Sequence, residues 1–99
     1  MTTDVYIPKP DEIVRLGVWV GVVLDVFKSE TTGKHIAQIK FAKNVYKQQP
    51  AELHVLEDLS EAMQLCPASK EDLEREVSRY EDIKRKELEA LRSTQQIPA

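Results

Sequence analysis

The chain is predicted to be an α+β protein: a small antiparallel β domain of about three to five strands, followed by a short helix and a long carboxy-terminal helix. Three observations predict this class. Residues 13–41 hold most of the β-branched residues and all three glycines. Residues 28–34 are polar and join two β-rich arms. Residues 69–94 lack glycine and proline and are rich in strong helix formers.

The first β-rich arm runs from Glu12 to Phe27 and contains too much valine for a good helix. Its length of about 16 residues exceeds the usual five or six of a strand, so we expect it to bend. Gly17 and Gly21 are the positions where a bulge or sharp bend fits best. A strand bent in this way would serve two sheets.

The second arm, residues 35–41, alternates between apolar and polar side chains. Ala37, Ile39 and Phe41 fall on one face, which predicts a half-buried strand with one wet face. The connecting residues 28–34 are polar and include Gly33, which can adopt positive φ. This composition is typical of a hairpin loop, so the two arms are expected to pair antiparallel.

The bent strand with Gly17 and Gly21, followed by a polar hairpin, resembles the strands of an SH3-like small barrel. The resemblance covers about half of the chain and concerns the fold alone. It implies that the sheet closes on itself, which would remove the exposed strand edges that invite aggregation.

The segments that follow give weaker patterns. Residues 42–50 are expected to form a short β-like piece and a polar turn that ends at Pro50. Residues 51–56 alternate again, with Ala51, Leu53 and Val55 on one face, and predict a third strand.

Two helix starts are marked by capping signals. Asp58 with Glu61 has the spacing of a capping box and predicts a short helix that ends before Pro67. Ser69, followed by two carboxylates, predicts the start of a long helix that reaches about Thr94. We therefore divide the chain into a small β-barrel-like part, residues 1–57, and a helical part, residues 58–99, within one compact domain.

The long helix carries one narrow apolar stripe, which spans an arc of about 80° at 100° per residue. Its members are Leu73, Val77, Tyr80, Leu88 and Leu91. Lys84 falls inside the same arc, so a strict heptad cannot be drawn through the whole segment. The helix is expected either to lie on the barrel along this stripe or to project and pair with a second copy, giving a homodimer.

Composition sets limits on the class of protein. The net charge of −3 lies in residues 58–99, because residues 1–57 contain seven basic and seven acidic side chains. No apolar run reaches the roughly 18 residues of a membrane span, and no signal peptide is recognised. The single cysteine, Cys66, cannot form an internal disulfide. We expect a cytoplasmic protein that does not contact membranes.

The best candidate for a binding face combines aromatic and basic residues, which are Trp19, Lys40, Lys43, Tyr46 and Lys47. If Trp19 and Tyr46 share an exposed face, they could form an aromatic groove for a peptide. Alternatively, the lysines could contact a phosphate backbone while Tyr46 stacks on a base. The acidic total disfavours this second interpretation.

No residues match a catalytic constellation, a metal-ligand spacing or a cofactor motif, so no cofactor is expected. The predicted function is that of a non-enzymatic protein-binding or assembly module. The barrel would contact a protein partner, while the helical stripe would dock or self-associate. A nucleic-acid-binding accessory protein that uses Lys40, Lys43, Tyr46 and Lys47 is the alternative.

Overall fold

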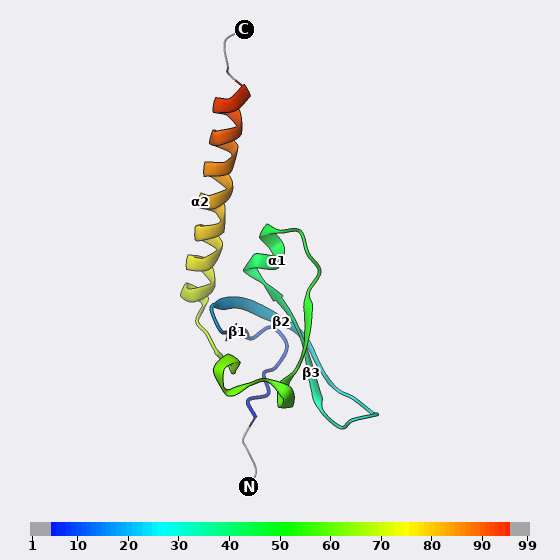
Figure 1. Ribbon diagram of the computed structural model, residues 1–99. Helices are drawn as coiled ribbons and strands as arrows, with labels where there is room; N and C mark the ends of the chain where they lie inside the picture. Colours follow the sequence, from blue (N-terminus) through cyan, green and yellow to red (C-terminus); the bar gives the residue numbers. More distant parts are fainter. Residues whose placement is uncertain (1–4, 96–99) are drawn as a thin grey trace.

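The fold was analysed in a computed structural model that describes residues 5–95. It contains one five-stranded antiparallel sheet with the order β4-β3-β2-β1-β5 and a long helix, α2, that leaves the sheet at one end (Figure 1). The strands are β1 (Ile13–Leu16), β2 (Trp19–Lys28), β3 (His35–Phe41), β4 (Glu52–Val55) and β5 (Leu65–Pro67). The α+β class is confirmed.

The first arm proves to be two strands, so the prediction of one long strand was wrong. Leu16 pairs with Trp19, which leaves a two-residue turn at Gly17 and Val18 between β1 and β2. Gly17 adopts φ +62°, a conformation that glycine enters without steric cost. The glycine expected to bend the strand therefore reverses the chain instead.

The expected strand shared between two sheets is not observed in residues 5–95, because β2 pairs with its two neighbours, β1 and β3, within one sheet. The first residues of β2 pair with β1, and residues from Gly21 onward pair with β3. The register shifts between Val23 and Asp25, so the irregularity lies at Leu24 and not at a glycine. Gly21 has a different role: a Cβ there would lie 2.6 Å from the carbonyl oxygen of Lys40, so only glycine permits this close approach.

The second hairpin agrees with its prediction. β2 and β3 pair as far as Lys28 with His35, and the polar residues between them form the loop. Ala37, Ile39 and Phe41 are fully buried, as the alternation indicated. They join residues of other strands, and Leu56 just after β4, in one core, whose further members are Val14, Leu16, Val23, Leu56 and Leu65.

The sheet is not closed into a barrel within residues 5–95, so the closure implied by the SH3-like resemblance is not observed. β4 and β5 are the two edge strands and do not pair with each other. β5 has three residues and ends at Pro67, which lacks a backbone donor. Such a short strand pairs with β1 and offers little edge for a further strand.

Residues 42–50 contain a short helix, α1 (Ala42–Tyr46), where the sequence predicted a β-like piece. The side chain of Asn44 explains the difference. Its Oδ1 accepts a hydrogen bond from the backbone N–H of Phe41 at 2.8 Å, and the residue is almost fully buried. A local bond between side chain and backbone thus turns the chain at the end of β3.

The predicted short helix, from Asp58 to before Pro67, is present only as a single 3₁₀ turn, η2 (Glu61–Met63), and an earlier turn, η1 (Leu56–Asp58), ends where the helix was expected to begin. The chain then returns to the sheet as β5, within the range predicted as helix. Leu65 enters the core from this strand.

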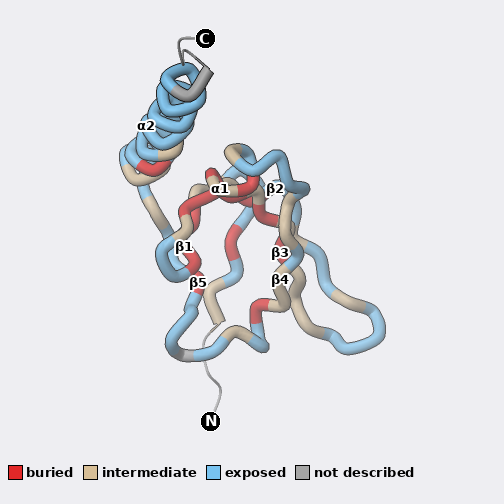
Figure 2. The backbone as a smooth tube through the Cα atoms, turned by 45° about the horizontal axis from the view of Figure 1, so that its top comes forward, coloured by how far each residue is buried: buried red, intermediate tan, exposed pale blue. Residues whose placement is uncertain are grey.

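α2 (Lys70–Gln95) begins as predicted. Ser69 Oγ accepts from the N–H of Asp72 at 3.1 Å, and a carboxylate oxygen of Asp72 accepts from the N–H of Ser69 at 3.0 Å. At 1.5 Å per residue the helix is about 39 Å long. Burial is concentrated in the sheet, whereas α2 is exposed over most of its length (Figure 2).

Candidate functional site

The predicted binding residues lie around α1, but they face several directions. Lys43 and Trp19 form a contact between a basic and an aromatic side chain, because the Nζ of Lys43 lies 3.6 Å from the centroid of the Trp19 ring. The Lys43 side chain is only 15% exposed, and its Nζ also lies 2.9 Å from Glu52 Oε2. Both residues are therefore engaged with their own fold.

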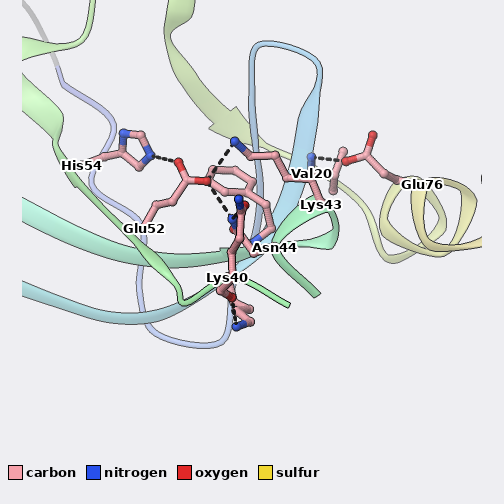
Figure 3. Close-up of polar contacts among 9 residues, drawn as sticks. Val20, Lys40, Lys43, Asn44, Glu52, His54 and Glu76 are labelled. Carbon is pink, nitrogen blue, oxygen red and sulfur yellow. Dashed lines mark hydrogen bonds and ion pairs between the residues drawn. The ribbon is translucent and has the colours of Figure 1, made fainter. Parts of the chain in front are cut away.

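Glu52 is the centre of a polar cluster on the inner side of β4 (Figure 3). Its carboxylate accepts a hydrogen bond from Asn44 Nδ2 at 2.9 Å and lies 3.0 Å from His54 Nε2. Burial alone would raise the pKa of Glu52, but its bonds with Asn44, Lys43 and His54 outweigh it and lower the pKa to about 2. The cluster fixes α1 to β4.

The other lysines do not continue this site. Lys40 Nζ donates to the backbone oxygen of Gln49 at 2.6 Å and so holds the loop after α1. Lys47 is exposed and, among the contacts within residues 5–95, its side chain has no polar partner. The structure therefore brings Trp19 and Lys43 together but does not gather the lysines into one basic face.

Tyr46 connects α1 to α2. Its ring stacks on that of Tyr80, with centroids 5.1 Å apart and planes inclined by 23°. Its hydroxyl donates to Glu87 Oε1 at 2.9 Å, and this bond, with partial desolvation, raises the pKa of Tyr46. Tyr46 and Trp19 therefore do not share an exposed aromatic face.

A second contact fixes α2 to the sheet nearer its start. Glu76 is 9% exposed, and its Oε2 accepts the backbone N–H of Val20 at 2.6 Å (Figure 3). Glu76, Tyr80 and Glu87 lie within about 40° on the helical wheel. We call these three residues the inner face of α2. No sequence pattern indicated that a glutamate would be buried here.

The apolar stripe predicted on α2 is centred about 60° away from the inner face. Leu73 and Tyr80, at its edge nearest the sheet, are half-buried. Val77, Leu88 and Leu91 are 38%, 47% and 57% exposed. The helix thus contacts its own domain through the inner face, which shares Tyr80 with the edge of the stripe, and its carboxy-terminal half projects beyond the sheet (Figure 1).

A second exposed apolar surface lies on the outer side of β2, β3 and β4. Phe27, Ile36 and Val55 form one row across the three strands, and Leu53 lies in the next row. Leu53 is 62% exposed. The sequence did not reveal this surface, because the face of β4 that carries Leu53 could not be assigned from alternation alone.

A groove of about 600 Å³ separates the turn between β1 and β2 from the first half of α2. Arg15 lies 3.3 Å from Asp72, and Arg79 lies 3.5 Å from Glu76. The lining contains arginines 15, 75 and 79 and carboxylates 72, 76 and 82. Because these opposite charges balance, the groove has no evident preference for an anion or a cation.

Residues 5–95 contain no group of three or more metal-ligating side chains arranged to hold an ion. In the same range, no helix combines the length and the apolar character needed to cross a membrane. No protein family matches the chain, and no curated protein or solved structure shows significant similarity to it.

Proposed function

We propose that this protein is a non-enzymatic assembly module, in which the sheet anchors α2 and α2 presents its apolar stripe for self-association with another copy of the chain. One observation carries the proposal: α2 is attached through its inner face, and Val77, Leu88 and Leu91 remain exposed beside it. Since the contacts of the inner face fix the helix, the stripe is held outward.

Burial of the stripe would be favourable. Removal of apolar surface from water contributes roughly 25 cal/mol per Å², and a row of large exposed apolar side chains on one element is typical of an interaction site. The stripe also lies on an ordered helix, so a partner would bind it with little further loss of backbone entropy. Leu88 and Leu91 belong to the carboxy-terminal half of α2, which projects beyond the sheet (Figure 1), and they are 47% and 57% exposed.

The support for a partner site on the sheet domain is weaker. Trp19, Lys43 and Tyr46 already have partners within the fold, and Lys40 holds a loop. The same contacts weaken the nucleic-acid alternative, because Lys47 alone among these lysines is free to meet a phosphate. The stripe is therefore the better supported interaction surface.

The test is the solution mass of the full chain, measured by light scattering over a concentration series. We expect the mass to rise from monomer to dimer with concentration. The double variant Leu88→Glu/Leu91→Glu should remain monomeric at every concentration, because it places carboxylates in the stripe.

The matched control is Leu53→Glu, which adds a carboxylate to the exposed apolar surface of the sheet. It should associate like the unmodified chain. Circular dichroism should show equal helix content in all three proteins. A chain that stays monomeric throughout, or a double variant that associates normally, would exclude assembly through the stripe.

A further inference from the structure

The charges beside the stripe are segregated along α2. On the side of the stripe away from the sheet, Glu74 and Glu81 lie in the amino-terminal half, and Arg85 and Arg92 lie in the carboxy-terminal half. All four are exposed and fall within about 40° on the helical wheel. We call this set the free flank. It is acidic at one end and basic at the other.

The opposite flank is occupied by the protein's own sheet domain. Glu76 accepts the N–H of Val20 there, and Glu87 accepts the hydroxyl of Tyr46. In a parallel helix pair the free flank of one copy meets the occupied flank of the other, so the charges of the two free flanks do not face each other. In an antiparallel pair like flanks meet, so the two free flanks face each other on one side and the two occupied flanks lie on the other side.

We propose that the stripe pairs with the stripe of a second copy of this chain, antiparallel, about a two-fold axis near Ile83. This inference rests on the proposed function. Glu74 and Arg92 are equally distant from residue 83 along the helix, as are Glu81 and Arg85. The axis therefore sets Glu74 against Arg92 and Glu81 against Arg85 of the second copy, and symmetry repeats both pairs.

The same axis matches the apolar residues. Leu91 of the second copy is level with the space between Leu73 and Val77, and Leu88 is level with the space between Val77 and Tyr80. The two exposed leucines thus meet the apolar residues at the other end of the stripe.

Two charged residues limit the strength of this pair. Lys84 lies in the stripe next to the axis, so the two copies bring two ammonium groups close together, which is unfavourable. Glu81 of the second copy offsets part of this repulsion, because it is level with Lys84 to within about 1.5 Å along the helix axis. Arg85 already lies 2.8 Å from Asp82 in the same helix. Its guanidinium has further donors for a second carboxylate. The pair is therefore weak and reversible, and its register depends on the free flank.

Charge reversal tests this arrangement. One variant carries Glu74→Arg/Glu81→Arg, which makes the free flank basic, and the other carries Arg85→Glu/Arg92→Glu, which makes it acidic. Each variant alone should have a dimer dissociation constant up to about tenfold higher than that of the unmodified chain, because four attractions become repulsions. An equimolar mixture should regain the dimer. Native mass spectrometry should identify that dimer as mixed, because the variants differ in mass.

The outcomes separate the two proposals. If the unmodified chain dimerises through the stripe but charge reversal has no effect, or the mixture gains nothing, the antiparallel arrangement is wrong and the assembly function stands. If the unmodified chain never dimerises, both fail.

Cysteine cross-linking gives a second measurement that does not need charge reversal. In a Cys66→Ser background, Lys84→Cys places two thiols beside the axis, whereas Leu91→Cys places them about 24 Å apart along the helix. With diamide as the oxidant, only Lys84→Cys should form a disulfide-linked dimer. A parallel pair would bring both sites together, so efficient cross-linking through Leu91→Cys would overturn the proposal.

Discussion

The side of α2 that contacts the sheet domain is mainly polar, and the side that stays exposed is mainly apolar, which is the reverse of the usual arrangement. The inner face meets the sheet domain through two glutamates and a tyrosine, whereas the apolar stripe beside it remains largely exposed. An amphipathic surface helix usually covers its own core with its apolar side. Here the orientation of the helix is set by directional contacts of the inner face, and most of the apolar side is left exposed.

The physical reason lies in what the sheet offers to the helix. The backbone N–H of Val20 is buried at the start of β2, and a buried donor without an acceptor costs about 1–3 kcal/mol. A carboxylate on α2 satisfies this donor, while a leucine there could not. The aromatic ring of Tyr46 adds a flat surface on α1, which Tyr80 covers. These two contacts orient the inner face toward the sheet.

The largest expected effect follows from removal of the buried carboxylate. Glu76→Ala should lower the free energy of unfolding by about 2–3 kcal/mol, because Val20 keeps a buried N–H without an acceptor and a charge-assisted bond is lost. Denaturant unfolding measures this change. Hydrogen exchange at the Val20 amide should accelerate in the same variant.

The matched control is Glu89→Ala, which removes an exposed glutamate from the same helix and should change stability by no more than about 0.5 kcal/mol. Equal effects of the two substitutions would mean that the inner face does not orient α2, and the contrast between the two sides would lose its physical basis.

The sequence predicted the elements whose signals are local. The polar loop after Lys28, the alternation of β3 and the Ser69 cap each depend on neighbouring residues, and the structure confirms them. The stripe on α2 could be predicted for the same reason. Its orientation could not, because Glu76 is fixed by Val20, 56 positions earlier in the chain.

The errors have the same origin in tertiary contacts. α1 replaces a predicted β-like piece because Asn44 bonds both the backbone of Phe41 and the carboxylate of Glu52. Lys43 and Tyr46, predicted as contact residues from their chemistry, also have partners inside the fold, and their role in binding another molecule stays a prediction. A short basic and aromatic stretch does not reveal whether its partner is another molecule or the next strand.

A smaller effect on the free energy of unfolding is expected on acidification. It concerns Glu52, whose bonds hold α1 next to α2. The pKa of Glu52 is about 2 in the folded state, against its ordinary value of 4.5 in the unfolded state, so the folded state binds fewer protons. Its stabilisation is complete above pH 4.5 and disappears as the pH falls toward 2. A shift of this size has a ceiling of about 3.4 kcal/mol, and we expect about 1–2 kcal/mol after solvent screening.

The measurement is the free energy of unfolding at pH 5.5 and pH 2 for the unmodified chain and for Glu52→Gln. The variant should lose about 1–2 kcal/mol less over this interval. Glu89→Gln, which removes an exposed carboxylate far from α1, should follow the unmodified chain. If Glu52→Gln and the unmodified chain had parallel profiles, the bonds to Lys43 and Asn44 would not control how α1 is held.

The smallest effect concerns the ring contact that joins α1 to α2, and a double-mutant cycle isolates it. Stacked aromatic pairs contribute about 0.5–1.5 kcal/mol beyond their buried area, so Tyr46→Leu and Tyr80→Leu should show a coupling energy of about 0.5–1 kcal/mol in unfolding. Tyr46→Phe separates the ring from the hydroxyl, because it removes the bond to Glu87 and keeps the stack. It should retain the coupling to Tyr80. A coupling near zero would mean that the inner face depends on Glu76 alone, and α2 would then turn about that contact and hold its stripe less firmly toward a second copy.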